Sequence, residues 1–128
     1  MPKHKLLIAD DQAGIRQGLR QMLEEEMSIY IGGEARNGFE VLEKVRAEAW
    51  DLVILDLTMP GKNGFEVLKE LRKECPELPV LVLSVHPAEQ YAARSIELGA
   101  RGYIVKERAP EELVPKVREL FQSPDRHP

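Results

Sequence analysis

The chain has 128 residues, of which 43% are hydrophobic and 31% charged, and this suits one domain with a core of its own. The net charge of −4 argues against non-specific nucleic-acid binding, and no apolar run approaches the roughly 20 residues of a membrane span. A single cysteine, Cys75, cannot form an internal disulfide. The start "MPKHKLLIADD" has basic residues but reaches acidic ones after a few apolar positions, so it is not a secretory signal, and we expect a cytoplasmic location.

Short apolar runs alternate with amphipathic segments along the chain. The runs predict five strands, at residues 5–9, 29–35, 52–55, 80–83 and 102–105. Helical spacing predicts five helices, at residues 12–25, after the Asn-Gly pair at 37–38, after Asn63, at 87–98 before Gly99, and at 110–121. Pro115 should kink the last helix or remove one of its backbone hydrogen bonds. We assign residues 1–122 to one domain and 123–128 to a tail or the start of a linker.

Strands that alternate with helices indicate an α/β fold with a parallel sheet covered on both faces. The strands are continuous runs of valine, isoleucine and leucine rather than alternating ones, which also favours burial on both sides. Right-handed crossovers then limit the topology to doubly wound orders.

Polar residues follow four of the five predicted strands. They are Asp10 and Asp11 after the first, Asp56 after the third, Ser84 after the fourth and Lys106 after the fifth. Each alone would be read as a turn, cap or surface residue. Because the carboxyl ends of parallel strands meet at one edge of the sheet, where such folds bind ligands, we expect these side chains to converge.

Three carboxylates against one lysine leave a formal charge of −2 at this edge. A divalent cation would neutralise it, and all-oxygen ligands suit Mg²⁺ or Mn²⁺. Asp56 beside a cation, a lysine and a hydroxyl is then well placed to attack an electrophilic phosphoryl group, whose oxygens Lys106 and Ser84 would hold.

Four motifs in order resemble the receiver domain of two-component response regulators. They are "IADD" (8–11), "LDLTMPGKNG" (55–64), "LVLSVH" (81–86) and "GARGYIVK" (99–106). The resemblance covers residues 5 to 121 and is strongest to the NarL/FixJ-type subfamily. It implies a flavodoxin-like, doubly wound sheet of five parallel strands in the order 2-1-3-4-5, with five helices.

The resemblance also implies a role for each strand-end residue. Asp56 matches the aspartate that a histidine kinase phosphorylates. Asp11 matches the direct Mg²⁺ ligand, Asp10 the ligand that acts mostly through water, and Thr58 the residue whose backbone carbonyl completes the metal shell. Lys106 matches the lysine that binds the phosphoryl oxygens.

Two further positions match the family's conformational switch, Ser84 as the hydroxyl and Tyr103 as the aromatic. Phosphorylation should draw Ser84 toward the phosphoryl group and let Tyr103 turn inward. Thr58, Val85 and His86 are candidates for tuning the reaction, and we expect Val85 to narrow access to Asp56.

By resemblance, such a chain is not an enzyme acting on a separate substrate, although it catalyses its own phosphorylation and dephosphorylation. Its output would be transcription, through a helix-turn-helix DNA-binding domain absent from this chain, or protein contact by a stand-alone phosphorelay or motility receiver. The residues 13–25 are a plausible kinase-docking face, and homodimerisation on phosphorylation stays open.

Other functions fit less well. An aspartyl-phosphate hydrolase of the haloacid-dehalogenase type needs an aspartate where this chain has Thr58. A nucleotide-binding loop needs a spacing that "GKNG" at 61–64 lacks. A flavin-binding module would not explain three clustered acids. The chain also departs from the family in having Glu107 where proline, with a cis bond, ordinarily follows the lysine, which leaves that peptide's geometry open.

Overall fold

The computed structural model describes residues 3–122. The elements are β1 (His4–Ala9), α1 (Ala13–Glu24), β2 (Ile29–Ala35), α2 (Gly38–Ala47), β3 (Leu52–Leu55), α3 (Gly64–Glu74), β4 (Val80–Ser84), α4 (Ala88–Glu97), β5 (Gly102–Val105), η1 (Lys106–Arg108) and α5 (Ala109–Gln122). The short 3-10 helix η1 was not predicted. The predicted tail, residues 123–128, lies outside the described residues.

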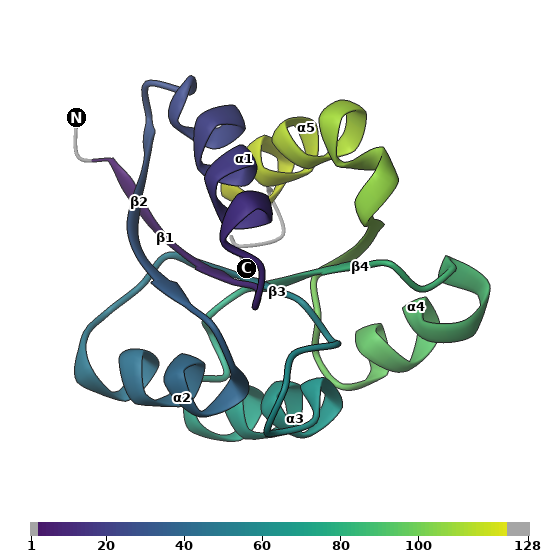
Figure 1. The fold of residues 1–128 in the computed structure, drawn as a ribbon. Coiled ribbons are helices and arrows are strands. Elements are labelled where there is room, and N and C mark those ends of the chain that lie inside the picture. The colour runs from purple at the N-terminus through teal and green to yellow at the C-terminus, as the bar shows by residue number, and fades with distance from the viewer. Residues whose placement is uncertain (1–2, 123–128) are drawn as a thin grey trace.

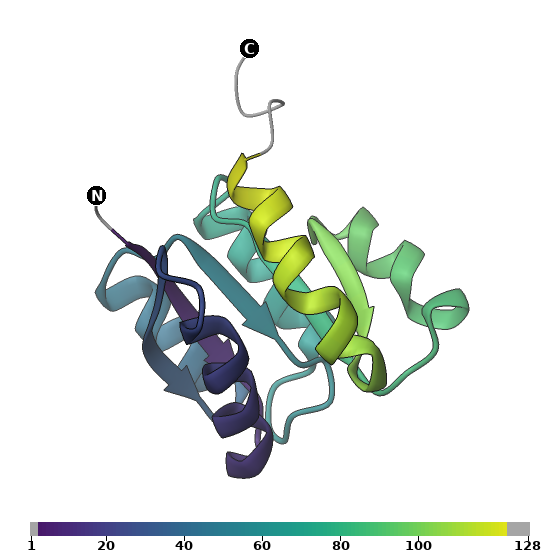
Figure 2. The same ribbon diagram turned by 90° about the horizontal axis from the view of Figure 1, so that it is seen from above.

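The five strands form one parallel sheet in the order β2-β1-β3-β4-β5, which confirms the predicted topology. Helices α1 and α5 cover one face, and α2 and α3 cover the other (Figure 1). Seen from above, α1 and α5 lie over the sheet, with their axes running roughly along the strands (Figure 2). The carboxyl ends of all five strands therefore meet at one edge of the sheet.

The core consists of two apolar layers, one on each face of the sheet. Successive residues of β1 alternate between them: Leu6 and Ile8 pack under α1 and α5, while Leu7 and Ala9 pack against α2 and α3. Every residue of β3 and β4 is buried, because both faces are covered. This burial explains why these strands are continuous apolar runs.

Strand β2 contains an irregularity that the two glycines of "IYIGGEA" made possible. Leu6 pairs with Ile31 but Leu7 pairs with Gly33, so Gly32 is an extra residue in β2. A bulge of this kind reverses which face the following side chains take. Glu34 consequently lies on the same side of the sheet as α1, to which it is hydrogen-bonded.

Local signals in the sequence account for several boundaries. The Asn37 side chain accepts a hydrogen bond from the Glu40 backbone N–H at 2.9 Å, and Asn63 caps α3 as predicted. Gly99 follows α4 with a φ of +111°, which glycine tolerates without strain.

The structure also answers the two questions that Glu107 and Pro115 raised in the sequence. No cis peptide occurs in the described range, so the bond between Lys106 and Glu107 is trans. Helix α5 continues through Pro115, which has no N–H to donate to the Glu111 carbonyl.

Within residues 3–122, no helix is both long and apolar enough to cross a bilayer.

Candidate functional site

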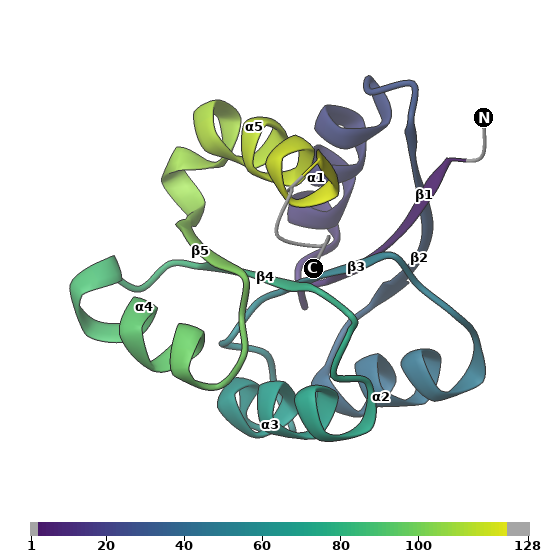
Figure 3. The same ribbon diagram turned by 180° about the vertical axis from the view of Figure 1, so that it is seen from behind.

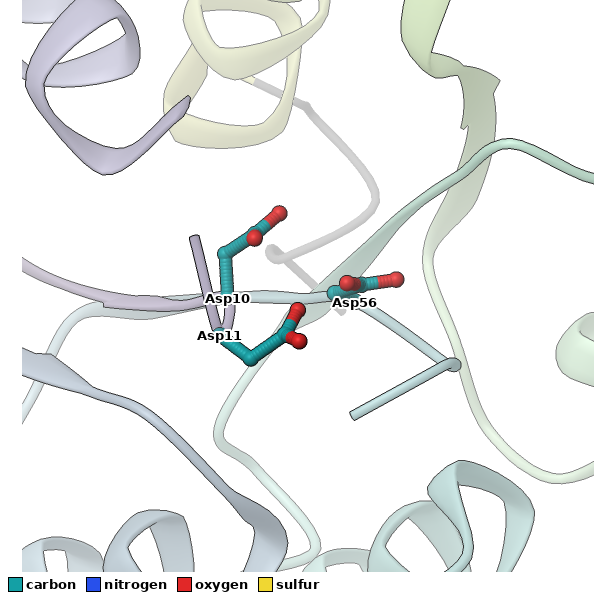
Figure 4. Close-up of side chains that lie close together, drawn as sticks. All are labelled: Asp10, Asp11 and Asp56. Carbon is teal, nitrogen blue, oxygen red and sulfur yellow. The ribbon is translucent and has the colours of Figure 1, made fainter. Parts of the chain in front are cut away.

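The predicted acidic residues meet at the carboxyl edge of the sheet. Asp10 and Asp11 follow β1 and Asp56 follows β3, and one carboxylate oxygen of each lies within 4.8 Å of the others (Figure 4). Backbone hydrogen bonds fix their positions, because the Asp10 N–H donates to the Ala35 carbonyl and the Asp56 N–H donates to the Ala9 carbonyl, both at 3.0 Å. The ends of three adjacent strands, β2, β1 and β3, thus hold the cluster.

Asp10 and Asp56 are almost fully buried, with relative exposures of 1% and 2%, whereas Asp11 is exposed. Burial of two carboxylates is costly unless positive charge compensates them. Lys106, at the end of β5, provides part of this charge: its Nζ lies 2.7 Å from Asp10 Oδ2 and 3.1 Å from Asp56 Oδ2.

The ammonium group of Lys106 responds to these neighbours. Burial alone would lower its pKa, but its contacts with Asp10 and Asp56 outweigh that effect and raise the pKa above its ordinary value. Lys106 is therefore a stable positive charge at neutral pH. One lysine does not balance three carboxylates, so the site keeps a net negative charge.

Asp10 is also short of hydrogen bonds. Its Oδ1 accepts from the Gln12 backbone N–H at 2.9 Å, but within residues 3–122 its buried Oδ2 accepts no hydrogen bond of good geometry. The 2.7 Å approach of Lys106 to this oxygen is an ion pair without good hydrogen-bond alignment. An underused buried carboxylate oxygen beside two other carboxylates is a donor set that fits a hard divalent cation.

Asp56 is held from both sides. Its Oδ1 accepts hydrogen bonds of 3.1 Å from the backbone N–H and from the hydroxyl of Thr58. Its Oδ2 accepts one from Lys106. Gly61, with a φ of +86°, allows the loop after Asp56 to turn back toward α3.

A second group of predicted residues comes from the end of β4, the loop after it, and β5. The fully buried Ser84 accepts a hydrogen bond from the His86 backbone N–H at 3.1 Å. Tyr103 is half-buried, and its hydroxyl donates to the His86 carbonyl at 2.7 Å. Ser84, His86 and Tyr103 thus form one hydrogen-bonded unit.

This unit is extended by the ring of Tyr91 in α4, whose centroid lies 4.5 Å from that of His86. Burial raises the pKa of Tyr103, so its hydroxyl is a donor at neutral pH. Val85 points outward instead and is 60% exposed.

The sequence reading missed two residues next to the cluster. Arg16 in α1 donates to the backbone carbonyl of Asp10 and to the side chain of Glu34 in β2. The available signal was a lone acid in an apolar strand together with Arg16 and Arg20, which stand four apart on the preceding helix. It was weak because such charges are ordinarily solvated.

Comparison with known proteins agrees with this geometry. The family model described as "Response regulator receiver domain" matches residues 6–118. The chain is 32% identical over 116 residues to the response regulator UvrY of Escherichia coli (strain K12). It is 34% identical over 119 residues to the oxygen regulatory protein NreC of Staphylococcus epidermidis.

Those alignments cover 91% and 92% of this chain but 53% and 55% of the relatives, so the chain spans about half their length. Among solved structures, the signal receiver domain of NarL from Mycobacterium tuberculosis superposes with a TM-score of 0.88 at 28% identity. That match covers 96% of this chain and 99% of the other. A LuxR-family response regulator from Aurantimonas superposes equally well, also with a TM-score of 0.88 at 28% identity.

Proposed function

The chain belongs to the response regulator receiver domain family, in its NarL/LuxR-type branch, and on this premise we propose that Asp56 accepts a phosphoryl group from a histidine kinase. The observation that carries the proposal is the setting of Asp56. It is a buried carboxylate in which one oxygen accepts hydrogen bonds from Thr58 and the other accepts one from Lys106, and two further carboxylates lie next to it. An arrangement in which an anion is held between donors suits a nucleophile that becomes more negative after reaction.

Asp10, Asp11 and Asp56 would hold a Mg²⁺ or Mn²⁺ ion, with the backbone carbonyl of Thr58 as a further ligand. When bound, the cation neutralises charge on the transferring phosphoryl group. The cluster's negative charge and the hydrogen-bond deficit of Asp10 support this assignment.

The transfer itself is a displacement at phosphorus. An Asp56 oxygen forms the new P–O bond while the P–N bond to the kinase histidine breaks, and the electron pair of that bond leaves with the imidazole. The positive charge of Lys106 would compensate the negative charge of the phosphoryl oxygens. The Thr58 hydroxyl, which now donates to Asp56, could donate to one of these oxygens. Water later attacks the acyl phosphate and returns Asp56 as a carboxylate with release of inorganic phosphate.

The signal would pass through the unit formed by Ser84, His86 and Tyr103. A phosphoryl group on Asp56 adds acceptor oxygens that compete for the Ser84 hydroxyl. Any shift of Ser84 would change its hydrogen bond with the His86 backbone N–H. The His86 carbonyl would move with it, and so would the hydrogen bond that this carbonyl accepts from the Tyr103 hydroxyl. The face formed by α4, β5 and α5 would then change its shape through a population shift.

We assign the output to transcription, exerted through a DNA-binding domain outside this chain, in the cytoplasm. The support is the similarity to regulators of about twice this length. The partners would be a sensor histidine kinase, for which α1 offers a docking face, and a second phosphorylated copy. A stand-alone receiver that acts by protein contact is the alternative, and the reading frame beyond this chain in its gene distinguishes the two.

The test is the intact mass after incubation with Mg²⁺ and acetyl phosphate. The wild type should gain one phosphoryl group and Asp56→Asn none. Asp51→Asn is the matched control, because Asp51 is exposed and lies at the opposite end of β3. Phosphorylation of Asp56→Asn would overturn the proposal, as would a wild type that accepts phosphate neither from acetyl phosphate nor from a phosphorylated kinase.

A further inference from the structure

Arg16 connects the acidic cluster to the rest of the fold. Its Nη1 donates to the backbone carbonyl of Asp10 at 2.7 Å, and its Nε donates to Glu34 Oε1, also at 2.7 Å. The side chain is only 12% exposed, so the guanidinium is enclosed between α1 and the sheet. A planar guanidinium that spans two acceptors fixes their relative position more firmly than a single donor would.

The carbonyl that Arg16 holds belongs to the peptide unit between Asp10 and Asp11. Because this unit is planar, its orientation also fixes where the chain continues into Asp11. Arg16 thereby constrains the link between two of the three carboxylates in the cluster, although it touches neither carboxylate in the contacts described.

Glu34 is a firm anchor for Arg16. Hydrogen bonds from Arg20 and then Arg16 lower the pKa of Glu34, so the carboxylate is charged throughout the neutral range. Its position depends on the bulge in β2. If Gly32 were paired with β1 in regular alternation and not bulged out, the side chain of Glu34 would point to the face of α2 and α3, away from Arg16.

The space at Gly32 explains why a glycine stands there. A Cβ at this position would lie 2.7 Å from the side chain of Lys5 and 3.1 Å from the ring of Trp50. The two side chains pack against each other, with the Lys5 ammonium 4.3 Å from the Trp50 ring centroid. The Lys5 and Trp50 side chains thus occupy the space beside Gly32, the residue at which β2 bulges and after which Glu34 faces Arg16.

We propose that Arg16 is a positioning residue for divalent-cation binding by Asp10 and Asp11, and that the bulge in β2 serves to anchor it through Glu34. The inference rests on the proposed function of the acidic cluster. Groups that orient metal ligands from behind typically contribute about 10- to 100-fold to metal affinity. We expect the removal of Arg16 to lower the Mg²⁺ affinity by the lower figure of this range, because Arg16 holds a backbone carbonyl and not an atom that binds the metal.

The sign of the effect separates positioning from simple electrostatics. Arg16 is a cation near a cation site, so removing its charge should tighten Mg²⁺ binding if charge alone matters. If Arg16 positions the loop, its removal should weaken binding. Arg20 provides the matched control, since it also hydrogen-bonds Glu34 and carries the same charge but makes no described contact with Asp10.

The experiment is a titration with MgCl₂ at constant ionic strength, followed by the backbone amide signals of residues 10–12 in NMR spectra. We expect Arg16→Met to bind Mg²⁺ about tenfold more weakly than the wild type, and Arg20→Met to bind normally. Phosphorylation by acetyl phosphate should require about tenfold more Mg²⁺ in Arg16→Met, with the rate at saturating Mg²⁺ preserved. Urea unfolding without Mg²⁺ serves as the check on folding.

Unchanged or tighter Mg²⁺ binding by Arg16→Met would overturn the inference, as would an equal loss in Arg20→Met. If Arg16→Met does not fold, Arg16→Lys takes its place, because lysine keeps the charge but lacks the fork that spans two acceptors, and the same weakening is expected. A wild type that binds no Mg²⁺ would overturn the proposed function as well. Normal Mg²⁺ binding by both wild type and Arg16→Met would overturn only the role of Arg16.

Discussion

The regions around α1 and around α4 hold their parts of the site by different kinds of interaction. Helix α1 buries Leu19 and Leu23, and charged side chains on it pair with Glu34 beside the acidic cluster. In α4 the only buried residue is Ser95, and its hydroxyl bonds back to the Tyr91 carbonyl within the same helix. Figure 3 shows α4 beside β5, at the margin of the sheet.

The difference suits the roles proposed for the two regions. Ligands of a cation must keep a fixed geometry, and the paired charges and buried leucines of α1 would provide it. A surface that switches needs few buried apolar contacts, so that a second packing lies close in free energy. Around α4, the described contacts of His86 are neutral hydrogen bonds and ring contacts, which can rearrange without exposing a buried charge.

Lys106 joins the two regions, because it directly follows β5 and contacts Asp10 and Asp56. We expect Lys106→Met to lower the rate of phosphorylation by acetyl phosphate about 100-fold, since it removes a charged donor aimed at the phosphoryl oxygens. The rate is measured by intact mass over time. Lys69→Met is the control, because Lys69 is half exposed on α3 and pairs only with Glu66 among the described contacts. A Lys106→Met rate close to that of the wild type would contradict the role of this lysine.

Tyr103→Phe tests whether the α4 region can be loosened by itself. The change removes the hydrogen bond to the His86 carbonyl and should lower the free energy of unfolding by about 1 kcal/mol. Amide hydrogen exchange should accelerate in α4 but not in α1, and phosphorylation should proceed at nearly the wild-type rate. Tyr30→Phe, at an exposed tyrosine of β2, is the control for urea unfolding and exchange. Equal acceleration of exchange in α1 would show that the two regions are not independent.

Acid should weaken the α1 region through Glu34. Because its pKa is lowered in the folded state, ionised Glu34 contributes stability that is complete above the ordinary glutamate pKa of about 4.3 and is lost as the pH falls below it. Glu34→Gln should therefore cost less than about 1 kcal/mol at pH 7, and its unfolding free energy should fall less steeply on acidification. Urea unfolding at a series of pH values from 7 downward measures both the cost at pH 7 and the pH dependence of the unfolding free energy. A pH dependence identical to that of the wild type would refute this role for Glu34.

Val85→Ala should have the smallest effect. Val85 is 60% exposed beside Ser84, so its truncation should change stability little, and it tests the expectation from the sequence that this side chain narrows access to Asp56. We expect phosphorylation by acetyl phosphate to accelerate about twofold, in line with the typical contribution of an exposed side chain, below about 0.5 kcal/mol. The initial rate by intact mass provides the measurement, and no change in rate would count against a gating role.

Much of this molecule is readable from local patterns. Continuous apolar runs and helical spacing give the order of the elements, because each signal lies within a few consecutive residues. The meeting of Asp10, Asp11, Asp56 and Lys106 also follows from the sequence, since parallel strands deliver their carboxyl ends to one edge. The turn η1 was missed, because a single 3-10 turn has no periodicity of its own.

The tertiary structure alone decided how the site is supported. Glu34 faces Arg16 because β2 takes up Gly32 as a bulge and does not pair it in regular alternation, and a shift of one residue reverses the face of every side chain that follows. The sequence shows two glycines there, but the side chains that leave no room for a Cβ at either position, Lys5 and Trp50, are distant along the chain. The sequence by itself therefore determined which groups reach the edge of the sheet, and packing between distant segments decided which neighbours hold them in place.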